Sequence, residues 1–183
     1  SRLDKKDVEQ IAELFQTPLT GAYVWNYEEA DKKIRKLYRL GKERNWNADS
    51  DVDWSITFPK SESPVHDVFN PFVGYAPFEK MSEKERIEFA WHQECWTLSQ
   101  FLHGEQGALL AACQVTNSYE WVDGKLYGST QVVDEGRHVE VFLRYLTEKL
   151  GRLYPINDNL YVIIDALVAD GRWDVKFLCM QIM

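Results

Sequence analysis

Apolar residues recur at intervals of three and four along most of the chain, a spacing that places them on one side of an α-helix. The pattern predicts helices at about residues 4–15, 27–43, 83–118, 126–151, 157–169 and 172–183. The longest of them begins with the capping box Ser82-Glu83-Lys84-Glu85 and contains no proline. Gly151 suits a carboxyl-terminal cap for the helix that precedes it. We therefore predict an all-α fold.

The region from residue 45 to residue 80 breaks this pattern. Prolines at positions 59, 64, 71 and 77 interrupt a segment rich in Asp, Ser and aromatic residues. We expect an irregular connection, with a short extended piece at Trp54–Phe58. Gly124 is predicted to mark the turn between the two longest helices. The chain thus divides into residues 1–80, with amino-terminal helices and a Pro-rich connection, and residues 81–183, a helical domain.

Composition and charge narrow the classes of function. A hydrophobic share of 45% in 183 residues is enough to bury a core, so the chain is expected to fold. Its net charge of −8 is spread along the sequence, which argues against nucleic acid and anionic membranes as partners. Since no long apolar run or amino-terminal signal pattern occurs, we expect a cytoplasmic protein. Cys95, Cys113 and Cys179 lack the spacing of a zinc site, and we expect buried free thiols.

Two carboxylates and one imidazole interrupt the apolar faces of the two longest helices. Glu105 has Phe101 and Leu109 at neighbouring positions of its helix, so its side chain is expected to be buried. Glu135 and His138 are three residues apart in the stretch QVVDEGRHVEVF and share a face. A buried carboxylate is costly unless a cation or a hydrogen-bonding partner compensates it. We therefore expect a positive charge beside these residues.

The spacing places these groups at the same level of a helix hairpin. Glu105 precedes Ser118 by the same number of positions as His138 follows Lys125. At about 1.5 Å per residue, each lies roughly 20 Å from the turn, so the two side chains are expected to face each other. Carboxylate and imidazole suit iron or manganese. A Glu from one helix and a Glu-x-x-His from its neighbour make half of the ligand set of a di-metal helix bundle.

The residues around these donors resemble a known family. His103-Gly104-Glu105, the small-residue run 108–112 and Asp134-Glu135-Gly136-Arg137-His138 are similar to the first ligand-bearing helix pair of ferritin-like di-iron carboxylate oxygenases. Among these, the catalytic subunits of bacterial multicomponent monooxygenases are most similar, and the ribonucleotide reductase small subunit is more distant. The resemblance covers about residues 88–150 and, more faintly, the last helix. It implies a ferritin-like four-helix bundle in which Glu105, Glu135 and His138 bind one of two iron ions, or of an Mn/Fe pair.

Further roles follow from the same resemblance. It implies that Asp134 and Arg137 hydrogen-bond toward the other half of the site and orient its ligands. It also implies that Phe101 and Phe142 line a pocket for dioxygen and a small organic substrate, and that a separate reductase supplies electrons. The position of Phe142 commonly holds the radical tyrosine in radical-generating reductase subunits, so a phenylalanine here disfavours that role.

The chain departs from the family pattern in one respect. The other Glu and the second Glu-x-x-His of the bundle are absent, and residues 172–183 look like the beginning of the third ligand helix. The bundle is therefore expected to be incomplete at its carboxyl end, with the remaining ligands in a continuation of the chain. The alternative is a homodimer in which each copy donates Glu105, Glu135 and His138.

Three classes of function remain open. The predicted function is a dioxygen-activating di-iron oxidoreductase that oxidises or hydroxylates an organic substrate. The alternatives are a radical-generating or iron-handling relative, and a metal-free helical scaffold in which Glu135 and His138 form a buried structural pair with a nearby arginine. His103, two residues from Glu105, is expected to be a packing or surface residue, and Glu94 a second polar contact in the bundle.

Overall fold

Helices make up the regular structure of the chain. The computed structural model describes residues 15–182, so the prediction of a helix at 4–15 falls on residues outside the described part, apart from its last residue. The described part contains six α-helices and no strand, which confirms the all-α class. The helices are α2 (Lys32–Glu43), α3 (Ala76–Glu79), α4 (Glu83–Ser118), α5 (Val122–Arg144), α6 (Asp158–Ala169) and α7 (Trp173–Ile182), with a 3₁₀ turn at Asp67–Phe69 and a π-helical stretch at Tyr145–Leu150.

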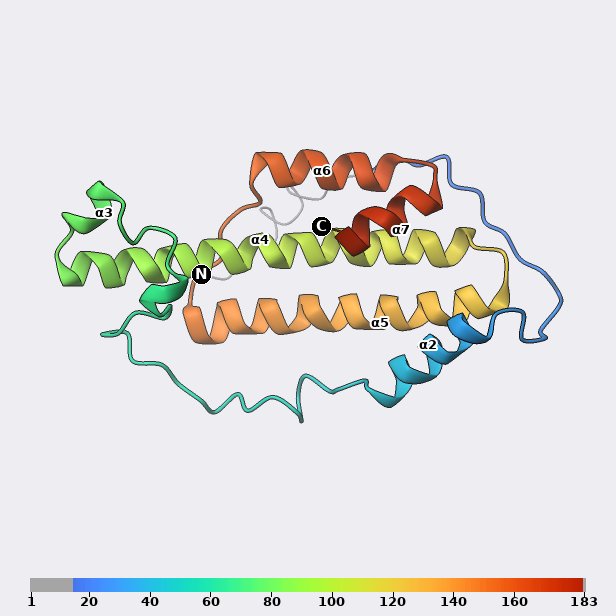
Figure 1. The fold of residues 1–183 in the computed structure, drawn as a ribbon, viewed down its shortest axis with the longest axis horizontal. Helices are drawn as coiled ribbons and strands as arrows, with labels where there is room; N and C mark the ends of the chain where they lie inside the picture. The colour runs from blue at the N-terminus through green and yellow to red at the C-terminus, as the bar shows by residue number, and fades with distance from the viewer. Residues whose placement is uncertain (1–14, 183) are drawn as a thin grey trace, which may run out of the picture.

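The long helices α4 and α5 lie side by side in opposite directions and form the centre of the molecule (Figure 1). The predicted capping box begins α4, because the Ser82 hydroxyl accepts from the Glu85 N–H and the Glu85 carboxylate accepts from the Ser82 N–H. Burial of apolar side chains between the helices provides the main stabilisation. One core cluster consists of Cys95 and Leu102 from α4 with Leu146 and Leu150 from the π-helical stretch.

The connection between α4 and α5 is shorter than predicted. α5 begins at Val122 rather than near residue 126, so the prediction that Gly124 marks the turn is wrong. The chain instead reverses within residues 119–121. A Cβ atom at Gly124 would lie 2.0 Å from the Tyr119 ring, so only glycine permits the ring to pack against the first turn of α5. The tight reversal therefore depends on the absence of a side chain at Gly124, and not on an unusual backbone conformation of this glycine.

The π-helical stretch that continues α5 ends at Gly151, which confirms the predicted cap. This glycine has a φ of +77°, in the left-handed region, and its N–H donates to the carbonyl of Leu146 at 2.8 Å. Between Tyr145 and Leu150 the chain adopts the wider π-helical geometry, and both Leu146 and Leu150 are buried against α4.

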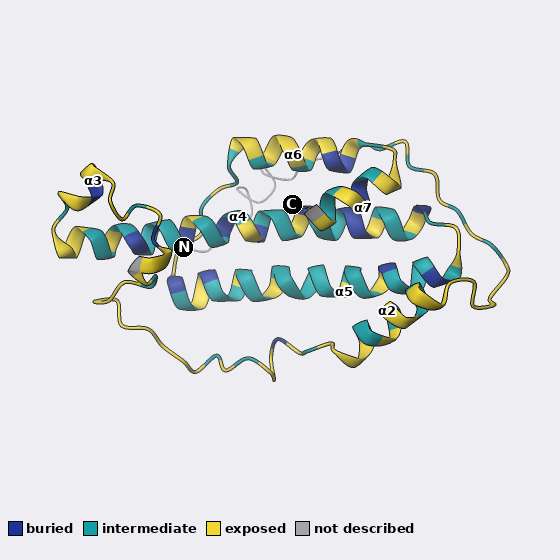
Figure 2. Ribbon diagram, in the orientation of Figure 1, coloured by how far each residue is buried: buried dark blue, intermediate teal, exposed yellow. Residues whose placement is uncertain are grey.

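The last two helices of the chain, α6 and α7, are short and pack on α4. α6 and α7 lie on one side of α4, whereas α2 lies against α5 (Figure 1). Lys176 of α7 is fully buried, and its Nζ donates to the carbonyls of Leu167 and Val168 at the end of α6. Burial lowers the pKa of this lysine. Outward-facing positions on α6 and α7 are exposed (Figure 2).

A buried carboxylate connects the amino-terminal segment to α5. Asp123 is 1% exposed, and its Oδ2 accepts from the N–H groups of Ala30 and Asp31 at 2.8 Å. Its Oδ1 accepts from Arg35 at 2.5 and 2.6 Å. Asp31 in turn caps α2, which begins at Lys32 rather than at the predicted residue 27. One side chain thereby positions the start of α2 beside the start of α5.

Two smaller predictions need correction. The irregular connection at 45–80 is confirmed, but the extended piece at Trp54–Phe58 forms no strand, and the Trp54 indole donates to the carbonyl of Ala48 at 2.6 Å. Of the three free thiols, only Cys95 is buried, because Cys113 faces outward from α4 and Cys179 is partly covered. Within residues 15–182, no helix is long and apolar enough to cross a membrane.

Candidate metal centre

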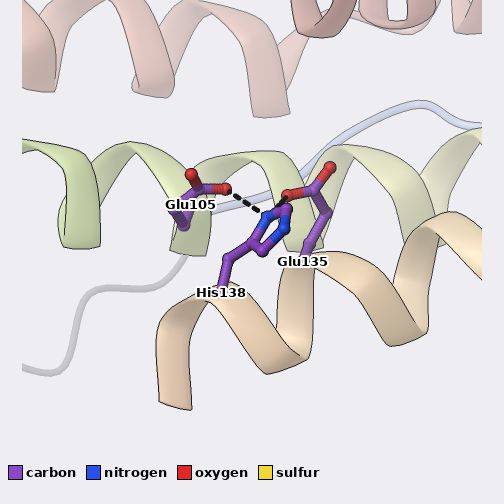
Figure 3. A group of neighbouring side chains, drawn as sticks. All are labelled: Glu105, Glu135 and His138. Atoms are coloured by element: carbon purple, nitrogen blue, oxygen red, sulfur yellow. Dashed lines mark hydrogen bonds and ion pairs between the residues drawn. The ribbon is translucent and has the colours of Figure 1, made fainter. Parts of the chain in front are cut away.

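Three predicted donors meet between the two central helices. Glu105 projects from the middle of α4, and Glu135 and His138 project from adjacent turns of α5 (Figure 3). The donor atoms of all three side chains lie within 4.8 Å of one another. Glu105 precedes the end of α4 at Ser118 by as many positions as Glu135 follows the start of α5 at Val122. Equal distance from the reversal therefore brings Glu105 level with Glu135, whereas the prediction, which counted from Lys125, placed Glu105 level with His138.

His138 lies between the two carboxylates. Its Nδ1 is 3.2 Å from Oε2 of Glu105 and 3.1 Å from Oε2 of Glu135 (Figure 3). The side chains of Glu105, Glu135 and His138 are 26%, 14% and 38% exposed, so the prediction that Glu105 is buried is wrong. The donors of the cluster come from α4 and α5 alone, and these two helices leave the group partly open to water.

Glu135 is the donor with the most altered acidity. Burial raises the pKa of Glu135 from 4.5 to about 7, and its hydrogen bond with Glu105 and the charge of Glu105 act in the same direction, against the opposing effect of His138. Two neighbouring carboxylates with little solvent disfavour a second negative charge. A cation placed between them would remove this repulsion, so binding of a cation would release the proton of Glu135.

The donor set fits a divalent metal ion of the first transition row. Two carboxylate oxygens and one imidazole nitrogen suit iron or manganese and also accept zinc, whereas no thiol belongs to the group. Three protein ligands for one ion leave coordination positions for water or another ligand, which is the arrangement of a reactive site rather than a closed structural one. The described residues place one such group, not two, between the helices.

Phe101 and Phe142 lie next to the donors along their helices. Phe101 is one turn before Glu105, and Phe142 is one turn after His138. The two rings contact each other across the helix pair with centroids 5.9 Å apart and planes tilted by 44°. Phe101 is 53% exposed. The rings therefore form an apolar wall at one end of the donor group, and their predicted role in lining a substrate pocket stays a prediction.

Asp134 and Arg137 form an ion pair at 2.5 Å on the neighbouring face of α5. The Arg137 guanidinium stacks on the Trp46 ring at 4.4 Å and donates to the Trp46 carbonyl at 3.1 Å and to the Asn45 side chain. The pair thus anchors the segment that follows α2. The Nε of Arg137 is buried without a hydrogen-bond partner among the described residues. The predicted role of this pair in orienting further metal ligands stays a prediction.

Other polar residues of α4 lie away from the donors. The prediction that His103 is a packing residue is confirmed, because its Nε2 donates to the carbonyl of Tyr154 at 2.9 Å. Glu94 is half-buried, and burial raises its pKa. A second polar group has no signal in the sequence: the Tyr154 hydroxyl lies 2.5 Å from Nδ1 of His92, and Arg152 donates to the same nitrogen at 3.2 Å. These partners are distant from His92 in the sequence, and no local pattern reveals the contact.

No family model matches the chain, and comparison with the curated proteins and with the solved structures gives no significant match.

Proposed function

We propose that Glu105, Glu135 and His138 bind one metal ion of a dinuclear iron, or manganese–iron, carboxylate site, and that the protein activates dioxygen to oxidise or hydroxylate a small organic substrate. The observation that carries the proposal is the convergence of these donors, from two helices, within 4.8 Å. It is supported by the resemblance of the segments around Glu105 and His138 to ferritin-like di-iron oxygenases.

The helix arrangement supports a ferritin-like four-helix bundle as the proposed architecture. Such bundles place metal ligands on inward faces at the middle of long antiparallel helices, and α4 and α5 carry their donors in this way. A second ion needs donors beyond Glu105, Glu135 and His138. In this proposal they come from further helices or from a second copy of the chain, which would also cover the partly exposed site.

The chain's own side chains have defined roles in the proposed reaction. When bound, a pair of iron ions supplies the redox chemistry that converts dioxygen into an oxidant, with electrons from a separate reductase. Glu105 and Glu135 neutralise the charge of the ion, and Glu135 releases its proton on binding. His138 supplies a neutral nitrogen donor. Phe101 and Phe142 cover one end of the site with apolar surface and provide an apolar contact for the substrate.

A metal-free helical scaffold is the second candidate, because one observation favours it. His138 already lies within hydrogen-bond distance of both carboxylates, so the three side chains can compensate one another without an ion. In that case Glu135 keeps its proton and the cluster contributes only to packing of α4 against α5. The two candidates differ in whether the purified protein binds iron.

Metal binding by matched variants separates the candidates. The protein is freed of metal with a chelator and titrated with ferrous iron without oxygen, and bound iron is measured after equilibrium dialysis. We expect His138→Ala and Glu135→Ala to weaken iron binding at least about tenfold, since each removes a ligand. His103→Ala is the control, because this histidine is two residues from Glu105 but bonds to Tyr154 instead. Iron content unchanged in both ligand variants would contradict the proposal.

A second readout separates an oxygenase from an iron-handling relative. The iron-loaded protein is exposed to dioxygen in the presence of a chemical reductant and candidate organic substrates. Oxidised organic product, lost in Glu135→Ala, supports the oxygenase. Rapid oxidation of iron with accumulation of ferric ion and without organic product supports the iron-handling alternative.

A further inference from the structure

A cavity of about 660 Å³ lies beside α4 near the end of the π-helical stretch, far from the metal donors. Figure 1 shows that α4 extends past the end of α5, which leaves a step along its amino-terminal turns. His92 lies in the wall of the cavity and precedes Glu105 by more than three turns of the same helix, roughly 20 Å along the axis. The cavity is therefore separate from the proposed metal centre.

The inner surface of the cavity is apolar and well anchored. It is formed by Ile87, Trp91, Cys95 and Leu150, of which Cys95 and Leu150 are buried. The Trp91 indole donates to the carbonyl of Glu62 at 2.9 Å, so its ring has a fixed position. A cavity of this volume that combines an apolar inner surface with polar and charged groups around it is typical of small-molecule binding sites.

Two cationic side chains, Lys60 and Arg152, lie where residues 150–152 line the cavity. Nζ of Lys60 lies 3.6 Å above the Trp91 ring and donates to the carbonyl of Leu150 at 3.2 Å. Nη1 of Arg152 donates to Nδ1 of His92 at 3.2 Å. Between residues 15 and 182, neither Lys60 nor Arg152 forms an ion pair with a carboxylate.

The lining also contains three charged residues of α4. Glu83, Lys84 and Glu88 lie on α4 one turn or more before His92. Glu88 precedes His92, the partner of Arg152, by about one turn, and Glu83 precedes it by more than two turns. In a chain with a net charge of −8, a cavity with an apolar inner surface and two cations without carboxylate partners favours an anionic ligand with an apolar body.

We propose that this cavity binds a small amphipathic carboxylate. The apolar part of the ligand packs on Trp91, Cys95 and Leu150, and its carboxylate accepts hydrogen bonds from the guanidinium of Arg152. Arginine presents paired N–H groups that match a carboxylate, and the bond to His92 holds the guanidinium in place. The nearby Tyr154 hydroxyl, 2.5 Å from the same His92 nitrogen, fixes the imidazole. This site is independent of the proposed metal chemistry.

The test uses octanoate as the probe and isothermal titration calorimetry on the metal-free protein. We expect octanoate to bind, and octan-1-ol, which has the same chain without the charge, to bind at least about tenfold more weakly. Arg152→Gln should weaken octanoate binding by about tenfold or more while leaving the binding of the alcohol unchanged. Arg39→Gln, on the exposed face of α2 and 61% exposed, is the matched control and should bind octanoate as the wild type does.

A second variant tests the cavity itself. Ile87→Trp adds a large ring to the lining and should abolish binding of both probes while retaining the thermal unfolding temperature within a few degrees. Failure of octanoate to bind the wild type up to its solubility limit would overturn the proposal. Equal binding of octanoate by the wild type and Arg152→Gln, or equal binding of the acid and the alcohol, would overturn it as well.

Discussion

Glu135 has a pKa of about 7, well above the usual 4.5, because it is largely buried beside Glu105. In the metal-free protein the folded state therefore holds a proton that the unfolded state releases between pH 4.5 and 7. A group of this kind makes the folded state progressively less stable as pH rises through that interval. The donor cluster thus has an unfavourable electrostatic energy at neutral pH, which a bound cation would remove.

Glu135→Gln tests this assignment in the metal-free protein. Above pH 7 the variant should be more stable than the wild type, by an amount on the order of 1 kcal/mol, because glutamine carries no charge to desolvate. Near pH 5 the difference should shrink, since Glu135 is protonated in the wild type as well. Urea unfolding of chelator-treated proteins from pH 5 to pH 8 measures the effect. Parallel stability curves for the two proteins would show that Glu135 titrates normally.

The members of the donor group could be predicted from the sequence, but their surroundings could not. Glu135 and His138 share a face by helical geometry, and equal distance from the reversal brings Glu105 to the same level. The stacking of Arg137 on Trp46 joins residues that are far apart in the sequence and has no local signal. The exposure of the site has no local signal either, because an apolar stripe indicates a face that can be buried, not whether another helix covers it.

Asp123 joins two helices that are distant in sequence, so its removal should separate them. Asp123→Ala leaves the Arg35 guanidinium and the N–H groups of Ala30 and Asp31 without their acceptor. We expect a loss of about 2–4 kcal/mol in the free energy of unfolding. Glu140→Ala, an exposed position in α5, is the control and should change stability by less than about 0.5 kcal/mol. Chemical denaturation measures both, and equal stabilities would contradict the role of Asp123.

The effect of acid on this contact follows from the pKa. Burial alone would raise the pKa of Asp123, but hydrogen bonds from Asp31, Arg35 and Ala30 hold it below the usual 3.8. The stabilisation is therefore complete above about pH 4 and is lost as pH falls through the lower folded-state value.

Two glycines of α5 should respond in opposite ways to alanine. Gly124→Ala places a methyl group against the Tyr119 ring and should destabilise the protein by about 1–3 kcal/mol. Gly136→Ala meets nothing within 4 Å and should stabilise it by up to about 1 kcal/mol through higher helix propensity. Thermal unfolding of the two variants gives the comparison. A stabilised Gly124→Ala would mean that the connection at residues 119–121 can move to accept the added atom.

Helix identity was easier to predict than helix boundaries. The capping box at Ser82 and the glycine cap at Gly151 are local signals, and the structure confirms both. The starts of α2 and α5 were misplaced by more than one helical turn. At these starts, packing against Tyr119 and the bonds of Asp123 decide where the helix begins, and both are tertiary contacts that helical spacing does not report.

At the scale of the whole molecule, iron should stabilise the fold if the three donors bind it. A ligand that binds only the folded state adds about 2.7 kcal/mol at a concentration roughly 100 times its dissociation constant. For a chain of this size the melting temperature should rise by about 5–10 °C. Differential scanning calorimetry without oxygen measures the shift, and His138→Ala should lose it. An equal shift in wild type and variant would assign the effect to iron bound elsewhere.

The hydrogen bonds of Asp123 with the segment at the start of α2 also have a consequence for the order of folding. They join two segments that are distant in the sequence, and the loop that they close contains all of α4. Contacts between neighbours in the chain close a short loop at small entropic cost, whereas distant contacts form later. We therefore expect the hairpin of α4 and α5 to assemble first. Helix α2 and the residues just before it would then dock on this hairpin in a later kinetic step.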